Sequence, residues 1–432
     1  MIGQLIFLSI VIFAVVFFSK NVRKIGRNIK LGRSIDRSDH FSDRLAVLLK
    51  VAFGQTKMVK RPVAAILHLF VYVGFVVINL EVLEIVIDGL FGTHRIFFEP
   101  LGRFYGFLIG VFEVLALLVL VGVILFYARR NWIRLRRFKG VEMTQWPLTD
   151  ANTILIAETM LMIAFLIMNA ADYRLQQLGV SHYTSVGTFP ISGFVAPLLP
   201  DSEFMLVAIE RFCWWFHIVG IFAFLNYLPY SKHFHILMAF PNTYYSNLQP
   251  KGAFTNMASV TNEVKAMLDP SYVPEPVVEG SRFGAKDVAD LTWKNLMDAY
   301  TCTECGRCTS SCPANITGKL LSPRKIMMDT RDRLTEVGNL IDQHGKDYSD
   351  GKSLLDSYIS REEIWACTSC NACTEACPIN IDPLAIIMEL RRFAVMEEAN
   401  VPTSLNSMFG NIENNGAPWK YSPADRLNWA KS

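Results

Sequence analysis

The sequence has 432 residues, of which 51% are apolar and only 19% are charged. A soluble multidomain protein of this length is normally more polar, so we expect part of the chain to lie in lipid. The formal net charge is +3, and the distribution of basic residues between membrane loops accounts for it. Nucleic acid is therefore not a predicted partner.

Five long apolar runs lie before about residue 240, and the rest has the polarity of a globular domain. The runs are Ile2–Ser19, Val63–Leu83, Phe104–Tyr127, Thr153–Ala171 and Phe212–Tyr230. Each is close to the ~20 residues that a helix needs to cross about 30 Å of hydrocarbon, so we predict five membrane spans. The first run has no preceding basic residue and no small-residue cleavage site, which favours a retained anchor over a signal peptide.

Basic residues are unevenly divided between the loops that join these runs. Residues 20–62 hold 12 Lys or Arg and residues 129–139 hold 6, whereas the loops at 89–103 and 172–202 hold only three Arg in total. Because Lys and Arg resist translocation, the two basic loops are predicted to be cytoplasmic. The N-terminus is then outside, and the chain after the fifth span lies on the cytoplasmic side of a bacterial-type inner membrane.

Eight of the nine cysteines lie in two copies of the pattern C-x2-C-x2-C-x3-C-P, TCTECGRCTSSCP at 301–313 and ACTSCNACTEACP at 366–378. Cytoplasmic thiols stay reduced, so disulfides are not expected. Structural zinc is a disfavoured alternative, because zinc sites usually use pairs of C-x2-C and need neither the third Cys nor the Pro. The ninth cysteine, Cys213, lies in the fifth run and is expected to be an inert buried thiol.

The spacing predicts two [4Fe–4S] clusters with crossed ligands. Three thiolates two residues apart wrap one corner of a cubane, and in two-cluster ferredoxins the fourth Cys serves the other cluster. The expected ligands of the first cluster are Cys302, Cys305, Cys308 and Cys377. Those of the second are Cys367, Cys370, Cys373 and Cys312.

The two motifs behave as an internal repeat. Matching positions inside the ligand loops hold Gly306 and Asn371, which tolerate the left-handed backbone of a tight turn. Each motif is followed by an N-cap residue with Pro after it, Ser322–Pro323 and Asp382–Pro383, so a helix is predicted to begin at each.

The 54 residues between Cys312 and Cys367 are too many for a compact β-rich ferredoxin, and they carry helical periodicity, as in PRKIMMDTRDRLTEV. This half resembles the α-helical ferredoxin of succinate dehydrogenase iron–sulfur subunits and heterodisulfide reductases. Two adjacent clusters indicate electron transfer, since this half offers no recognisable nucleophile, base or substrate pocket.

Of eight histidines, His68 and His217 lie inside predicted spans, and His233 and His235 follow the fifth. Ligand-type residues inside a membrane are functional suspects, and the simpler alternative is an imidazole that bonds a backbone carbonyl. A haem b held by two histidines needs ligands at matching depth on neighbouring helices. We expect His68 and His235 to hold a cytoplasmic-side haem, with His217 as the less favoured partner of His68.

This assignment assumes that the fifth helix continues past Tyr230. His217 and His235 are 18 residues apart, which is five helical turns and about 27 Å, so a continuous helix would place them on one face. His233 would then be rotated away, and we expect it to meet lipid headgroups together with Lys232.

The segment WFHIVGIFAFLNYLPYSKHFHILMAFP resembles the last span of the haem b membrane subunit of respiratory nitrate reductase. The matching positions are His217, Pro229, Ser231, Lys232 and His235. In that family the second span supplies two histidines ten residues apart, and here the first is His68 but the second position is Ile78. The resemblance therefore implies one haem. His217 could then bind a second haem with an unidentified partner ligand, or it could face a quinone.

Carboxylates within the spans are also unusual, because burial of a charge is costly. Glu113, Glu158, Glu81 and Glu84 are candidates to deliver protons for quinone reduction. For Glu81 and Glu84, structural pairing with Arg103 or Arg211 is an alternative at least as favoured.

The segment DPSYVPEPVVEGSRFG predicts an extended linker. LTWKNLMDAY and the last 32 residues resemble segments of heterodisulfide reductase-related iron–sulfur proteins that precede paired Cys-Cys-Gly domains. The sequence has no Cys after Cys377, so the resemblance implies a separate Cys-Cys-Gly iron–sulfur subunit or another cytoplasmic oxidoreductase as partner.

The predicted fold class is all-α, a five-span bundle followed by a cytoplasmic α-helical ferredoxin domain. The expected divisions are a cytochrome b-like domain over 1–240, a linker over 241–290, the ferredoxin domain over 291–400 and a partner-docking tail over 401–432. The predicted function is a membrane electron-transfer subunit between a cytoplasmic redox partner and quinone, with two [4Fe–4S] clusters and haem b. The alternative is a redox-sensing or assembly scaffold whose clusters are structural.

Overall fold

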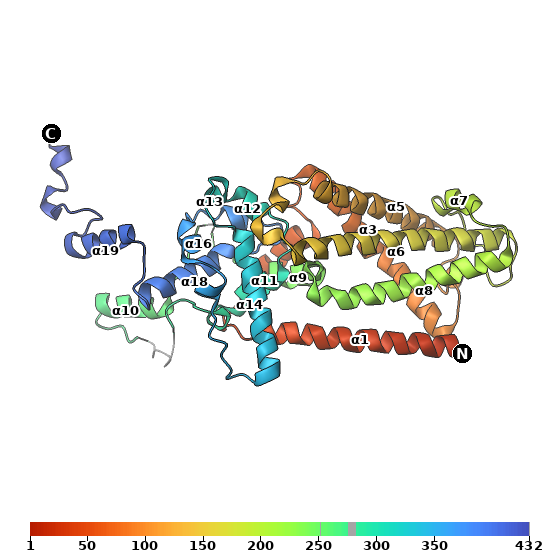
Figure 1. Cartoon of the computed structure of the whole chain (residues 1–432), viewed down its shortest axis with the longest axis horizontal. Helices are drawn as coiled ribbons and strands as arrows, with labels where there is room; N and C mark the ends of the chain where they lie inside the picture. The colour runs from red at the N-terminus through yellow and green to blue at the C-terminus, as the bar shows by residue number, and fades with distance from the viewer. Residues whose placement is uncertain (251, 275–281, 432) are drawn as a thin grey trace.

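The computed structural model describes residues 1–250, 252–274 and 282–431. Five long helices lie side by side in a bundle (Figure 1), and all five are long and apolar enough to cross a membrane. They are α1 (Ile2–Ile29), α3 (Pro62–Phe91), α5 (Arg103–Asn131), α6 (Trp146–Gln177) and α8 (Glu203–Tyr227). The predictions of an all-α fold and of five spans are confirmed, and the chain is a membrane protein.

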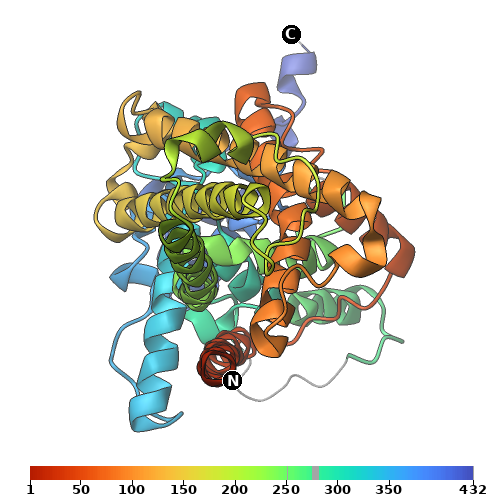
Figure 2. The ribbon, with the colours of Figure 1, turned by 90° about the vertical axis from the view of Figure 1, so that its right-hand side faces the viewer.

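Helix α6 forms the centre of the bundle and packs against α5 and α8, while α3 packs against α5. Figure 2, which views the bundle end-on, shows α1 at its edge. Two glycines permit close packing, because an added Cβ would lie 2.3 Å from Val119 at Gly74 and 2.7 Å from Leu161 at Gly220. Small residues at such crossings let membrane helices approach closely.

The end of the bundle that holds the N-terminus contains a buried polar network around Arg95. The Arg95 guanidinium donates to Asp172 at 2.7 Å, and the Tyr105 hydroxyl donates to Glu84 at 2.6 Å. The predicted pairing of Glu84 with Arg103 or Arg211 is therefore wrong. Arg211 instead bonds to Glu210, its neighbour in the chain, and Glu84 accepts its hydrogen bonds from the Tyr105 hydroxyl and the Phe97 amide.

A compact helical domain lies at the opposite end of the bundle (Figure 1). Its main helices are α11 (Trp293–Thr301), α14 (Pro323–His344), α16 (Arg361–Ala366) and α18 (Pro383–Met396), and the short α12 (Arg307–Ser311) and α17 (Ala372–Ala376) follow the cysteine loops. Both predicted helix starts are confirmed. Ser322 accepts a hydrogen bond from the Lys325 amide and Asp382 accepts one from the Ala385 amide.

Shorter helices connect these parts. They are α2 (Phe41–Val47), a π-helical turn at Leu48–Phe53, α4 (Phe98–Leu101), α7 (Ser192–Val195), α9 (His235–Tyr244), α10 (Ala258–Leu268), α13 (Pro313–Ile316), α15 (Leu354–Ser357) and α19 (Thr403–Asn415). Part of the predicted extended linker, residues 275–281, lies outside the described residues. Ala285 and Val288 are buried in the same core as Leu296, so the chain enters the helical domain before residue 290. The segment that contains α19 extends away from the rest (Figure 1).

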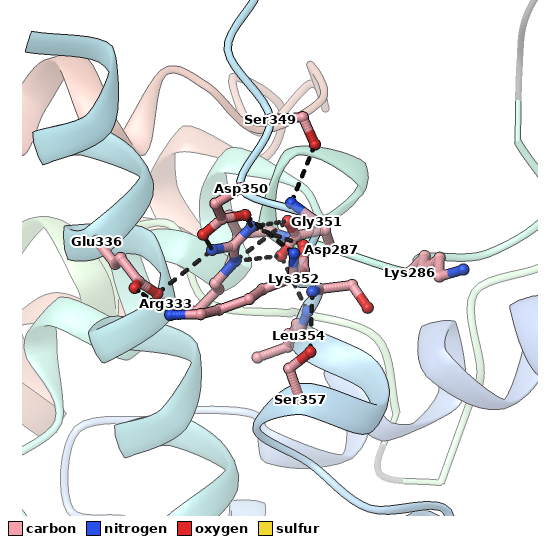
Figure 3. Close-up of polar contacts among 12 residues, drawn as sticks. Lys286, Asp287, Arg333, Glu336, Ser349, Asp350, Gly351, Lys352, Leu354 and Ser357 are labelled. Carbon is pink, nitrogen blue, oxygen red and sulfur yellow. Dashed lines mark hydrogen bonds and ion pairs between the residues drawn. The ribbon is translucent and has the colours of Figure 1, made fainter. Parts of the chain in front are cut away.

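Arg333 of α14 anchors the long segment between the two cysteine motifs, residues 314–365, through several ion pairs (Figure 3). Its side chain is 4% exposed, and its guanidinium bonds at 2.7 Å to Asp287, which precedes α11, and at 2.7 Å to Asp350. It also donates to the Lys352 carbonyl at 2.8 Å. One buried cation therefore joins three segments that are distant in the chain.

Replacing this arginine should destabilise the helical domain. Arg333→Met leaves two carboxylates without their cation and should lower the free energy of unfolding by about 3 kcal/mol. Denaturant unfolding followed through the visible absorbance of the cluster-bearing domain measures this. Lys352→Met is the matched control, because Lys352 pairs with Glu336 at 2.7 Å but is 51% exposed, so its loss should cost less than about 1 kcal/mol. Equal losses of unfolding free energy in the two variants would show that the ion pairs of Arg333 do not hold these segments together.

Candidate redox site

The two cysteine loops have the same backbone course. In the first, Glu304 and Gly306 adopt φ values of 54° and 70°, and in the second Ser369 and Asn371 adopt 56° and 60°. The left-handed turns predicted at Gly306 and Asn371 are confirmed. Each turn leads directly into a short helix, α12 in the first motif and α17 in the second.

Cys377 of the second motif lies with the cysteines of the first. The pKa of the Cys377 thiol is raised to about 12, chiefly by burial and also by the nearby Cys305 and Cys302. Burial likewise raises the pKa of Cys308, with contributions from Cys305, Cys302 and Cys377. Metal ligation requires the thiolate form, so these buried thiols would lose protons on binding a metal centre.

Cys312 of the first motif lies with the cysteines of the second. Burial raises the pKa of Cys367, and its thiol neighbours in that environment are Cys312 and Cys370. Burial raises the pKa of Cys373 to about 12, where Asp382 and then Cys367 add to the effect. These influences link Cys377 with thiols of the first motif and Cys312 with Cys367 of the second, while Cys373 also acts on Cys308. The crossed ligand assignment stays a prediction.

Within the described residues, no three His, Cys, Asp or Glu side chains converge as they would around a single metal ion. Tetrahedral zinc would hold four thiolates at about 2.3 Å from one centre. A polynuclear cluster distributes its thiolate ligands over several metal ions, so the criterion for a single-ion site does not apply to it.

The first cysteine loop lies against the membrane bundle. Glu304, which stands between Cys302 and Cys305, forms ion pairs with Lys232 at the end of the fifth span and, at 2.8 Å, with Arg331 of α14. Lys232 also lies 3.7 Å from Asp150 of α6. Burial by itself would raise the pKa of Glu304, but the charges of Arg331 and Lys232 outweigh it and hold that pKa below its ordinary value.

Other polar contacts secure the same interface around Glu304. Asn28 of α1 donates to the Tyr300 hydroxyl at 2.9 Å, and Arg324 of α14 bonds to Glu142 at 2.7 Å. Trp293 donates to the Ile35 carbonyl at 2.9 Å. The second group of thiols has a more open position, since Cys370 is the exposed cysteine of the eight.

Three histidines gather at the bundle end beside this interface. Burial lowers the pKa of His233 to about 3, and the adjacent His235 and His68 contribute. The His233 and His235 rings lie 5.5 Å apart. His235 Nδ1 lies 3.1 Å from the Lys232 carbonyl, an arrangement that leaves Nε2 free to act as a metal ligand.

The assumption of a continuous fifth helix is wrong. Helix α8 ends at Tyr227, a 3-10 turn covers Leu228–Tyr230, and Ser231 is extended with φ −116° and ψ 151°. Pro229 lacks an amide donor, and Asp150 accepts the Lys232 amide at 3.1 Å, which stabilises the break. His217 and His235 therefore do not share one straight helical face.

The break also corrects the expectation for His233 and Lys232. His233 is turned inward, with its Nε2 3.4 Å from Glu158 of α6, and its side chain is 12% exposed. The Lys232 side chain is 9% exposed and is enclosed between Asp150 and Glu304. Neither residue meets lipid headgroups as predicted, because the break at Ser231 folds both into the protein.

His217 lies apart from this group. Its Nδ1 is 3.0 Å from the Leu161 carbonyl on α6, and its ring is 5.7 Å from that of Phe165. Among the described residues, no second imidazole is in ring contact with it. The sequence did not predict the inward position of His233 or the Asp150–Lys232–Glu304 contact. Pro229 could have indicated the break in the helix, and the charged residues at the span ends could have indicated buried pairs.

Comparison with known proteins agrees with this geometry. Residues 301–381 match the 4Fe-4S dicluster domain family. The chain is 27% identical to a probable iron-sulfur-binding oxidoreductase FadF of Bacillus subtilis, over 99% of this chain and 60% of that protein. It is 27% identical to an EtfAB:quinone oxidoreductase of Syntrophomonas wolfei, over 91% of this chain and 55% of that protein.

A shorter match covers the cysteine-rich half. It is 34% identical to one subunit of a ferredoxin/F(420)H(2)-dependent CoB-CoM heterodisulfide reductase of Methanosarcina acetivorans, over 24% of this chain and 52% of that protein. No solved structure matches the chain. The chain thus spans between half and two thirds of the first two relatives, and its ferredoxin half carries a two-cluster [4Fe–4S] domain. The haem and the quinone stay predictions.

Removing the carboxylate at the centre of the interface should weaken docking of the ferredoxin domain. Glu304→Gln leaves Lys232 and Arg331 buried without their partner, and we expect a loss of about 3 kcal/mol. Because the folded-state pKa of Glu304 is held below the ordinary 4.5, its contribution is present above about pH 4.5 and is lost as the pH falls through the folded-state pKa.

Denaturant midpoints at pH 7 and pH 4 measure both effects. Asp342→Asn is the control at the same interface, since Asp342 is 31% exposed and pairs with Lys24 at 2.9 Å, so its loss should cost less than about 1 kcal/mol. A Glu304→Gln midpoint equal to that of the unmodified protein at pH 7 would contradict the interpretation.

Proposed function

We propose that this chain is a membrane-bound electron-transfer subunit. It carries electrons between a cytoplasmic redox partner and the quinone pool through two [4Fe–4S] clusters and one haem b. The observation that carries the proposal is the position of Lys232: its ion pair with Glu304 places the first cysteine loop directly against the segment that contains His233 and His235.

The cysteines have the role of ligands in this proposal. Cys302, Cys305, Cys308 and Cys377 hold the cluster beside the membrane, and Cys367, Cys370, Cys373 and Cys312 hold the outer one. Support comes from the crossed grouping of the thiols and from the exposure of Cys370, which leaves the outer group accessible to a partner. The bound centres supply reversible one-electron chemistry, and the protein sets their spacing and surroundings.

His68 and His235 are the proposed haem ligands. His68 comes from α3 and His235 from α9, different elements as an axial pair requires, and both act on the pKa of His233. The Lys232 carbonyl orients His235, and His233 lies beside the pair next to Glu158. His217 has no partner of this kind among the described residues, which favours a single haem.

The quinone is proposed on the name of the Syntrophomonas wolfei relative and on the position of the haem ligands in the bundle. Glu158 is the better candidate for proton delivery, because Glu113 already accepts hydrogen bonds from the amides of Ile191 at 2.9 Å and Ser192 at 3.2 Å. The Glu158 carboxylate instead faces His233, an imidazole beside the proposed haem ligands.

The N-terminus lies at the end of the bundle opposite the ferredoxin domain (Figure 1). Together with the basic loops, this supports an outside N-terminus and a cytoplasmic ferredoxin domain in a bacterial-type inner membrane. The proposed partner is a Cys-Cys-Gly iron–sulfur subunit or another cytoplasmic oxidoreductase that approaches the side of Cys370. A scaffold with structural clusters would have no need of the histidine group.

The crossed ligation predicts which cluster each substitution removes. Cys312→Ser should damage the second-motif cluster and Cys377→Ser the first-motif cluster, because each residue is grouped with the opposite motif. Electron paramagnetic resonance of the reduced protein distinguishes the two signals. Cys213→Ser, which alters the one cysteine outside the motifs, should change neither. Selective loss of the first-motif signal in Cys312→Ser would overturn the assignment.

The function is tested with membranes that contain the protein. Added quinol should reduce the haem, or added quinone should oxidise it, and His68→Ala and His235→Ala should each abolish the haem spectrum because an axial ligand is lost. His344→Ala is the control, since His344 is exposed at the end of α14. If neither reaction with quinone occurs in membranes whose clusters are intact, the scaffold alternative is favoured.

A further inference from the structure

A pocket of about 420 Å³ lies where the membrane bundle meets the ferredoxin domain. Its wall comes from the start of α3, the end of α5 with the loop that follows it, and α12 inside the first cysteine motif. The lining includes Arg61, Arg129, Arg136, Arg137, Val63 and Ser310. Four arginines therefore surround one opening, and no carboxylate is among the lining residues.

The arginines of this pocket differ from the paired arginines elsewhere in the interface. In the part of the chain that the structure describes, none of the four forms an ion pair, and Arg61 instead donates to the Ser310 hydroxyl at 2.6 Å. The Nε of Arg137 is buried and, among the described residues, has no hydrogen-bond acceptor. A buried donor without an acceptor is costly, and an anionic group in the pocket would supply an acceptor.

The electrostatics agree with this interpretation of the geometry. Burial lowers the pKa of Arg137 to about 10, and the positive charges of Arg61, Arg307 and Arg129 act in the same direction, while Cys305 opposes them. Like charges gathered at a half-buried site repel one another unless an anion lies between them. Arg136 is exposed, whereas Arg61, Arg129 and Arg137 are partly buried, so three of the four cations are partly removed from water.

The position of the pocket identifies the class of anion. It opens where two membrane helices meet the cytoplasmic boundary, and Val63 beside it is 55% exposed. The same loop exposes Trp132 and Ile133, at 75% and 64%, and Trp is typical of the membrane interface. A phosphate attached to acyl chains satisfies both the arginines and the apolar rim, whereas a free phosphate satisfies only the arginines.

We infer that this arginine pocket binds the phosphate headgroup of an acidic phospholipid of the cytoplasmic leaflet, which bridges the bundle and the ferredoxin domain. The lipid would bridge the bundle to the first cysteine motif in particular, because Ser310 lies between Cys308 and Cys312. A lipid held by Arg129 and Arg136 would thus reach the cysteine loop itself. Arginine forks suit phosphate oxygens. The lipid would then help to seat the ferredoxin domain against the histidine group.

The experiment uses the full chain purified in detergent. Phosphatidylglycerol, phosphatidylcholine or inorganic phosphate is added, and bound lipid is measured by native mass spectrometry together with the unfolding midpoint of the ferredoxin domain. Phosphatidylglycerol should bind and raise the midpoint, whereas phosphatidylcholine and inorganic phosphate should not. Equal effects of the two lipids, or stabilisation by inorganic phosphate to the same degree, would overturn the inference.

The double variant Arg129→Gln, Arg136→Gln should bind phosphatidylglycerol on the order of tenfold more weakly, because two phosphate-facing charges are lost. Arg134→Gln is the matched control, since Arg134 is an exposed arginine of the same loop that does not line the pocket. Equal weakening of phosphatidylglycerol binding in both variants would show that general surface charge causes the effect, and this would overturn the proposed site. If the double variant does not fold, the comparison of lipids on the unmodified chain still decides.

Discussion

A buried charged contact between the two halves organises this molecule. Lys232 at the inner end of the fifth span lies between Asp150 of the bundle and Glu304 of the first cysteine loop, and all three are almost fully enclosed. Charges removed from water must be paired, so moving the ferredoxin domain away from the bundle would leave Lys232 and Glu304 without each other. The position of the cysteine loop beside the histidines is therefore a consequence of charge pairing.

The same constraint shapes the opposite end of the bundle. Arg95 enters the helices from a loop and is satisfied by Asp172, Asn169 and the Tyr105 hydroxyl. Polar groups within a membrane need internal partners, because lipid offers none. The arginine pocket beside α12 departs from this pattern, since its cations form no ion pair among the described residues, and this contrast led us to infer a lipid there.

The ferredoxin half is organised by repetition. Two loops have left-handed residues at equivalent positions and carry three closely spaced cysteines each. In the proposed ligation each loop lends its fourth thiol to the other centre. Such an exchange makes the two loops mutually dependent, and the contact of α12 with α17 brings them together. Arg333 then holds the long excursion between the loops against the segment that precedes α11.

The sequence by itself determined the features that depend on local chemistry. Apolar run length set the five spans, since a helix needs about 20 residues to cross the hydrocarbon. Cysteine spacing predicted two clusters, and the tolerance of Gly and Asn for positive φ located the turns at Gly306 and Asn371. Each of these properties is fixed within a few residues of chain.

Only the tertiary structure decided how the end of the fifth span is built. The chain breaks at Ser231 because Asp150, some eighty residues earlier, accepts the Lys232 amide, and local periodicity contains no record of that acceptor. The break turns His233 toward Glu158 and Lys232 toward Glu304. Side chains that a continuous helix would have directed to lipid are thus enclosed, because pairing of buried charges outweighs continuation of the helix.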